Sequence, residues 1–203
     1  PTRQVLQRQS PLLGVVGDAT AEIVEEVTTE HQPGDDAISF APSGTTLAVA
    51  YQGPQDERTG AFLPHDGDPA VQLFEVPGGR VVGSLSGPAG SYHSPDHDAS
   101  GRWLAAIHLG VDDSREIVVW DAAAGGLPRS LGAATWFDFL PGSDSVVLLG
   151  PRLTGLAVVD LITGDIIREF ETPDLVGYQV VEIDPSGRLA ALLSPFGRRV
   201  YIF

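Results

Sequence analysis

The sequence of 203 residues contains no cysteine, no methionine and no lysine. Without cysteine the chain forms neither disulfides nor thiolate metal sites, and it has no cysteine nucleophile. No apolar run approaches the roughly 18 residues of a membrane-spanning helix, and no charged-then-apolar leader opens the sequence. These absences do not determine the compartment, and of the possible locations we favour the cytoplasm.

Basic residues are scarce. Twelve of them stand against 27 acidic ones, which gives a formal net charge of −15. Such a surface repels nucleic acid and anionic membranes, so we expect neither as a partner. All the basic residues are arginine, which we interpret as the composition bias of a high-GC bacterial genome. No P-loop, dinucleotide fingerprint or Gly-x-Ser-x-Gly elbow is present, so nucleotide, hydride and nucleophile-elbow chemistry lack support.

Glycine and proline are abundant, at 24 and 16 residues, which favours short strands joined by turns over long helices. The clearest example is the stretch 101–132. It predicts strands at 104–108, 117–120 and 127–131, separated by glycine, serine and aspartate. The chain length fits one domain, which we expect to cover residues 1–203.

The same pattern returns along the chain as strand, turn, strand, loop, strand, turn, strand. Trp120, Val159 and Phe203 recur at intervals of 39 and 44 residues. The predicted units are 3–29, 31–86, 90–132, 133–172 and 175–203. The first lacks its first strand and the last lacks its final strand, so we expect a fragment of a longer protein. An alternative for residues 19–30 is an amphipathic helix, but their β-branched content favours a strand.

Three dipeptides end the third strand of their units: Trp120-Asp121, Phe74-Glu75 and Val159-Asp160. Turns with Ser-Gly follow the first strands at 42–44, 99–101 and 185–187, and His31 stands nine residues before Phe40 of one first strand. In these features the chain resembles WD-repeat and related bacterial β-propeller proteins, whose period is about 40–45 residues. Most of that family's internal polar network is missing, because Pro88, Ser130 and Asp174 occupy the histidine position.

The resemblance implies an all-β fold, a β-propeller of four-stranded antiparallel blades, with about four and a half blades present. Bulky side chains should fill the space between blades, among them Phe40, Phe74, Trp120 and Phe139. Because natural rings have about four to eight complete blades, we expect more chain or a second polypeptide to complete the propeller.

The loop at 52–70 is the longest and is a candidate recognition segment. Phe62, Leu63, His65, Asp66 and Asp68 are its candidate partner-binding residues, although a disordered polar insertion is an equal alternative. The run from His65 to Asp68 also permits Ca²⁺ or Zn²⁺ ligation, but a solvated acidic turn is favoured. Corresponding loops add four further candidates, which could also be solvated charges: Asp112, Asp113, Arg152 and Arg198.

A second polar cluster holds His93, Asp96 and His97 on a predicted first strand. If they converge, they could form a metal or acid–base site. The alternative is that His97 packs in the core at the position that Phe40 and Phe139 occupy elsewhere. Asp98 is typical of a turn residue.

The sequence therefore predicts a non-catalytic protein-interaction, sensor or scaffold module within a larger bacterial signalling or regulatory protein. We expect a protein partner, no catalytic residues and no cofactor. The first alternative is a metal-dependent hydrolase of the propeller lactonase type, which would use His93, Asp96 and His97. The second is a purely structural array of blades.

Overall fold

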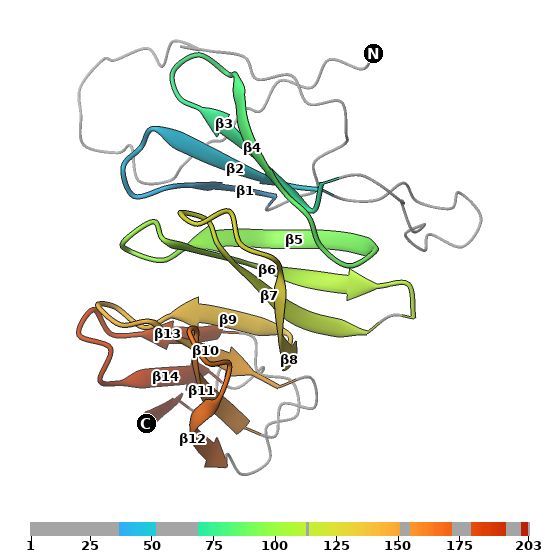
Figure 1. Ribbon diagram of the computed structural model, residues 1–203. Helices are drawn as coiled ribbons and strands as arrows, with labels where there is room; N and C mark the ends of the chain where they lie inside the picture. The colour runs from blue at the N-terminus through green and yellow to red at the C-terminus, as the bar shows by residue number, and fades with distance from the viewer. Residues whose placement is uncertain are drawn as a thin grey trace.

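The computed structural model describes residues 37–51, 69–112, 114–150, 155–171, 180–193 and 200–202. Every regular element in these residues is a strand, and Figure 1 shows the strands gathered into successive sheets. No helix in the described part of the chain is long and apolar enough to cross a membrane. The predicted unit at 3–29 and the helical alternative at 19–30 lie outside the described residues.

The strands form three four-stranded sheets and one three-stranded sheet, in which each strand pairs antiparallel with its neighbour in sequence. The first sheet holds β1 (Ile38–Phe40), β2 (Thr46–Ala50), β3 (Val71–Glu75) and β4 (Val81–Leu85). The second holds β5 (Gly90–His97), β6 (Trp103–Gly110), β7 (Arg115–Asp121) and β8 (Arg129–Ala133). The third holds β9 (Trp136–Phe139), β10 (Ser145–Leu149), β11 (Gly155–Asp160) and β12 (Ile166–Glu171). The fourth holds β13 (Val180–Ile183), β14 (Ala190–Leu193) and β15 (Val200–Ile202).

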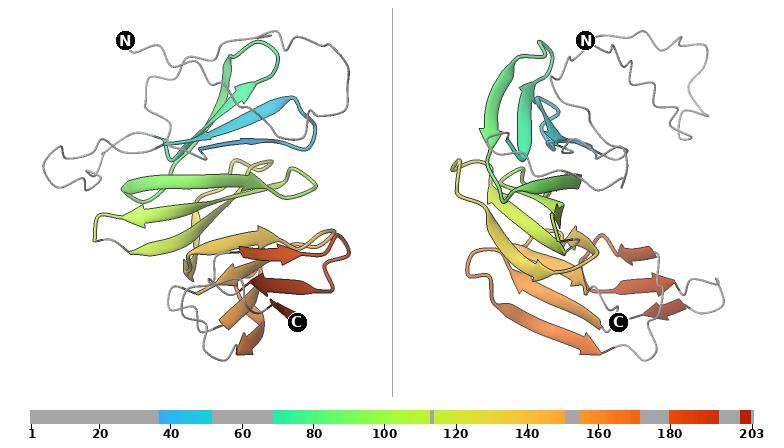
Figure 2. Two further views of the ribbon diagram at one scale, coloured as in Figure 1. Left: turned by 180° about the vertical axis from the view of Figure 1, so that it is seen from behind. Right: turned by 90° about the vertical axis from the view of Figure 1, so that its right-hand side faces the viewer.

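The sheets pack face to face, and Figure 2 shows them following one another along an arc. The middle strands are apolar on both faces, as strands covered on both sides must be. Ala48, Ala105 and Ala106 are fully buried on these strands, and their small side chains let neighbouring sheets approach closely. The prediction of an all-β propeller built from antiparallel blades is confirmed.

Three apolar layers join the four sheets. The layer between the first and second sheets includes Ala50, Val71, Leu85, Leu104, Val118 and Trp120. The layer between the second and third includes Trp103, Ile117, Val119, Phe137, Phe139, Val146 and Leu148. The layer between the third and fourth includes Val147, Leu149, Leu156, Phe170 and Ile183. Each sheet thus buries its side chains against the next sheet along the chain.

One of the predicted core positions is wrong. Trp120, Phe74 and Phe139 are buried as expected, but Phe40 is 58% exposed. It pairs with Leu47, so it lies on the face of the first sheet that points away from the second sheet. Leu47 and Phe74 on the same face are buried, so the exposure is confined to Phe40 at the end of the edge strand β1.

Antiparallel pairing gives the stack two edges with different connections. Segments 52–68, 111–114, 151–154 and 194–199 join second to third strands at one edge, together with the linkers between sheets. We call this the loop edge. The tight turns, such as 41–45, 98–102 and 122–128, lie at the opposite edge, which we call the turn edge.

Candidate partner-binding edge

The linker at residues 86–89 joins the first sheet to the second at the loop edge, and three buried rings of the second sheet hold its backbone. Trp120 donates from Nε1 to the Ser86 carbonyl (2.7 Å). The Tyr92 hydroxyl donates to the Pro88 carbonyl (2.7 Å), and His108 Nε2 donates to the Ala89 carbonyl (3.2 Å). The rings also pack together, with centroids 4.8 Å apart for Tyr92 and His108 and 5.8 Å apart for Tyr92 and Trp120. We call these three residues the ring clamp.

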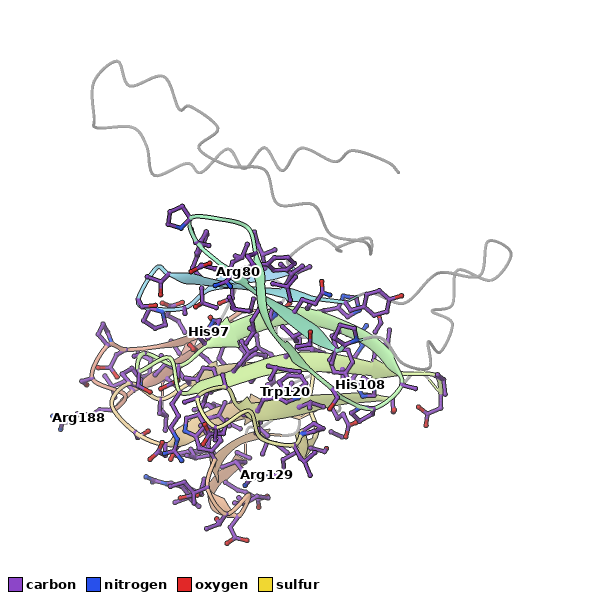
Figure 3. All side chains as sticks on the ribbon, turned by 45° about the horizontal axis from the view of Figure 1, so that its top comes forward. Arg80, His97, His108, Trp120, Arg129 and Arg188 are labelled. Carbon is purple, nitrogen blue, oxygen red and sulfur yellow. The ribbon has the colours of Figure 1, made fainter. Side chains whose placement is uncertain are left out.

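The ring clamp satisfies polar groups that burial would otherwise leave unpaired. Trp120 and His108, labelled in Figure 3, are 0% and 4% exposed. A buried donor without an acceptor costs about 1–3 kcal/mol. The linker carbonyls therefore provide the acceptors that these buried donors need.

The clamp lies beside the root of the long segment 52–68. Tyr51 donates its amide to the Ala70 carbonyl (2.9 Å), which closes the base of that segment. Tyr92 donates its amide to the Tyr51 carbonyl (2.8 Å), which ties this base to the second sheet. Tyr51, which directly precedes the segment, is thus hydrogen-bonded to both the first and the second sheet.

Of the predicted partner-binding residues, Asp112 is described. It is exposed in the turn between β6 and β7, at the loop edge, where it accepts hydrogen bonds from the Ser114 hydroxyl (2.5 Å) and amide (3.2 Å). These bonds lower the pKa of Asp112, because they stabilise its charged form. The other candidates lie outside the described residues: Phe62, Leu63, His65, Asp66, Asp68, Asp113, Arg152 and Arg198.

The predicted polar cluster on β5 is divided between different partners. His93 Nε2 is 3.2 Å from the Ser91 hydroxyl, whereas His97 Nδ1 is 3.2 Å from the Ser39 hydroxyl of the first sheet. Asp96 accepts from that same Ser39 hydroxyl (3.3 Å). A β-bulge separates His93 from Asp96 and breaks the regular alternation that would place them together. Within the described ranges, no three histidine, aspartate or glutamate side chains are grouped so as to hold a metal ion.

The structure instead reveals a row of carboxylates that sequence reasoning missed. Asp96, Asp138 and Glu182 occupy the same register position on the first strands of three successive sheets. Ser39 stands at this position in the first sheet. The signal was present in the sequence, because each of these residues directly precedes the aligned Phe40, His97, Phe139 or Ile183.

Two members of this row, Asp96 and Asp138, have raised pKa values. Loss of hydration raises the pKa of Asp138, and the neighbouring charges of Asp96 and Glu182 raise it further. Loss of hydration also raises the pKa of Asp96, although hydrogen bonds from the His97 amide and Ser39 hydroxyl oppose the rise. Folding therefore disfavours the ionised form of the carboxylates on these first strands.

Replacing Asp138 with asparagine should stabilise the fold at neutral pH. Because the folded state raises this pKa, proton uptake stabilises folding as the pH falls, and that contribution is lost as the pH rises through the raised pKa. Asparagine resembles the neutral acid at every pH. We expect a thermal midpoint roughly 1–3 °C higher at about pH 7.5, with the gain shrinking toward about pH 4.5.

The matched control is Asp165→Asn, an exposed position in the turn between β11 and β12. It should move the midpoint by less than about 1 °C at either pH. An Asp138→Asn midpoint equal to or below that of the unmodified chain at about pH 7.5 would contradict the carboxylate row.

The turn edge is built from self-contained turns and from hydrogen bonds between the second and third sheets, which Arg102, Trp103 and Arg129 donate. Asp98 accepts from the Ser100 amide (3.0 Å), the Ser100 hydroxyl (2.5 Å) and the Trp103 amide (2.7 Å), so it caps its turn as the sequence suggests. Trp103 Nε1 donates to Asp144 of the third sheet (2.7 Å). Polar groups at this edge thus largely bond one another, whereas the loop edge carries the longest connections.

Comparison with known proteins identifies the fold. No protein-family model matches the sequence, and neither does any curated protein. Among solved structures, 709 chains are similar. One is hydrazine synthase of Kuenenia stuttgartiensis, with a TM-score of 0.59 and 18% identity over 86% of this chain and 46% of that chain. Another is the β-propeller domain of Cps50 (Swd1) from Myceliophteria thermophila, with a TM-score of 0.56 and 14% identity over 78% of this chain and 48% of that chain.

The chain therefore spans about half the length of these structures. Identities of 18% and 14% are too low to carry over an activity, because one fold hosts many functions. What the similarity does show, together with the antiparallel sheets, is that the chain folds as a β-propeller.

Proposed function

We propose that the chain is a non-catalytic protein-interaction module of the WD-repeat type, and that it binds a protein partner through its loop edge. The observation that carries this proposal is the root of segment 52–68, which is hydrogen-bonded to both the first and second sheets. A long segment on a rigid base can contact a partner with little loss of order in the base itself.

The dipeptides behind the WD-repeat resemblance support the finer assignment. Asp121 and Asp160 cap the turns that follow their strands: Asp121 accepts from the Ala124 amide (3.0 Å), and Asp160 accepts from the Ile162 and Thr163 amides (2.8 Å each). Trp120 fills the layer between two sheets. Both residues of the dipeptide therefore have structural roles, which is consistent with a scaffold.

We also propose that further blades complete the ring, supplied by more chain or by a second polypeptide. The comparison structures are about twice as long as the matched part of this chain. The full protein would then be a larger regulatory or signalling protein that uses this propeller for binding.

Deleting residues 55–68 tests the proposed binding edge. The strands on either side are joined through Tyr51 and Ala70, so the deletion should leave the thermal midpoint within about 2 °C. Binding to the partner should fall by at least about tenfold, because the contacts supplied by Phe62 and Leu63 are removed. The partner is first identified by affinity capture, and binding is then measured between purified components.

The matched control is Val81→Ser with Val82→Ser. These two apolar side chains are about half exposed on β4, the last strand of the first sheet, close to the turn edge. The pair should bind like the unmodified chain. If the deletion binds equally well, or if the β4 variant loses binding instead, the loop edge is not the interaction surface.

A further inference from the structure

His108 lies in the ring clamp with an acceptor at each ring nitrogen. Nδ1 is 2.9 Å from Glu116 Oε1 on β7, and Nε2 is 3.2 Å from the carbonyl oxygen of Ala89 in the linker. The ring is 4% exposed, while the Glu116 side chain is 26% exposed. Both interactions therefore lie largely inside the protein, where hydrogen bonds are stronger than in water.

The two contacts of the His108 ring require two protons. A carbonyl oxygen can only accept, so the bond to Ala89 needs a proton on Nε2. The contact with Glu116 needs a second proton between Nδ1 and the carboxylate. A neutral imidazole beside an ionised carboxylate has only one proton for the two positions. Both bonds exist together only when the His108–Glu116 pair holds two protons.

The surroundings fix both partners in place. The other oxygen of Glu116 accepts from the Ser130 hydroxyl of β8, so the carboxylate is held at both oxygens. Gly90 follows Ala89 with φ of +151°, and a Cβ at this position would overlap His108 Nε2 and the Leu109 carbonyl. The linker therefore lies so close to the ring that a change in the hydrogen bonding of His108 shifts the linker backbone.

We propose that the His108–Glu116 pair is a proton-operated latch on the linker between the first and second sheets. It is closed while the pair holds two protons, and it opens when one proton leaves for solvent. In the open state Nε2 has lost its hydrogen, and its lone pair faces the Ala89 carbonyl oxygen. Two acceptors at this distance repel each other, so the linker moves away from the ring.

Among the residues that the structure describes, few charged groups surround the ring. Glu116 faces it from β7, and Asp112 interacts with it electrostatically from the turn between β6 and β7. The Tyr92 phenol stacks on it from β5, and burial raises the pKa of that phenol, so it stays neutral. Linker residues 86–89 contain no titratable side chain. The latch is therefore controlled mainly by the one His108–Glu116 pair.

Opening the latch weakens the neighbouring hydrogen bond between Tyr92 and Tyr51. The Tyr92 amide bonds the Tyr51 carbonyl only three residues after the linker residue Ala89, and this bond ties the base of segment 52–68 to the second sheet. A linker released from His108 loosens that tie. The inference goes beyond the proposed function, and testing it needs no partner.

Hydrogen exchange at the Tyr92 amide in the full chain tests the latch. After correction for intrinsic exchange, its protection should fall about tenfold from about pH 5.5 to about pH 8.5, as the pair loses one of its two protons. In Glu116→Gln the fall should disappear. The glutamine amide nitrogen can donate to Nδ1 while its oxygen accepts from Ser130, so a neutral His108 keeps Nε2–H on Ala89.

Side-chain ¹⁵N correlation spectra of His108 provide the second measurement. In the unmodified chain both ring nitrogens should be protonated at about pH 5.5 and one at about pH 8.5. His97→Asn, at the far end of β5, is the control and should leave the Tyr92 protection profile unchanged. A single protonated nitrogen at about pH 5.5, or the same loss of protection in Glu116→Gln, would overturn the latch.

Discussion

Replacing Trp120 with alanine should lower the free energy of unfolding by about 3–5 kcal/mol, a large part of what a single domain has. Its side chain is fully buried between the first two sheets, where it packs with Leu104 and Val118. Truncation leaves a cavity in that layer and removes the donor to the Ser86 carbonyl. Urea unfolding, followed by circular dichroism, measures the loss.

Two further variants separate the causes. Trp120→Phe keeps most of the apolar volume and loses the indole donor, so it should cost about 1–3 kcal/mol. Leu127→Ala is a control at a side chain that is 88% exposed, and it should change stability by less than about 0.5 kcal/mol. If Trp120→Ala costs no more than Leu127→Ala, the layer between the first two sheets is not built as described.

Replacing Gly90 with alanine should destabilise the fold by about 2–4 kcal/mol. Its φ of +151° is one that residues with a side chain rarely adopt, and the added Cβ would overlap His108 and the Leu109 carbonyl. Since one of these atoms belongs to the backbone, a rotamer change alone cannot relieve the overlap. The loss is measured as a shift of the urea midpoint, with a check that the slope is unchanged.

Gly44→Ala is the matched control, because this glycine also has positive φ, at +70°, but has open space where a Cβ would be. It should cost only about 1–2 kcal/mol, the conformational penalty without the overlap. Equal costs at the two positions would mean that the linker does not lie against the His108 ring as closely as the structure places it.

The arrangement of strands could be predicted because it follows from patterns of side chains. Apolar runs on middle strands, Ser-Gly turns and the Trp120-Asp121 dipeptide each have a local physical cause that a single sequence displays. The outer strand of the second sheet is a partial exception. It runs at Arg129–Ala133, two residues later than predicted, because residues 122–128 form the turn before it.

The ring clamp could not be predicted, because its acceptors are backbone carbonyls. Ser86, Pro88 and Ala89 contribute oxygens that every residue carries, so nothing in their side chains marks them as partners of Trp120 or His108. His108 stood in an apolar strand without any neighbouring histidine or cysteine. Its role depends on tertiary contacts with Glu116, eight residues away, and with the linker nineteen residues before it.

On the polar strand β5, a local irregularity separates residues that the sequence pattern places together. Regular alternation would place His93 and His97 on one face, which is the arrangement that a shared metal or acid–base site requires. Ser94 instead adopts a positive φ of 48° within the bulge, and the strand bends there. The carboxylate row was predictable in principle, because its members share one register position. Comparing the polar residues of the repeated units, as well as their apolar residues, identifies this row.

Footprinting the complex between the intact chain and its purified partner tests the central claim most directly. Binding should protect the loop edge from hydroxyl-radical labelling, most strongly at segment 52–68 and at the turn 111–114 between β6 and β7. Turns 76–80, 122–128 and 161–165 at the turn edge should be labelled equally with and without the partner. Protection concentrated on those turns, with segment 52–68 unchanged, would contradict binding through the loop edge.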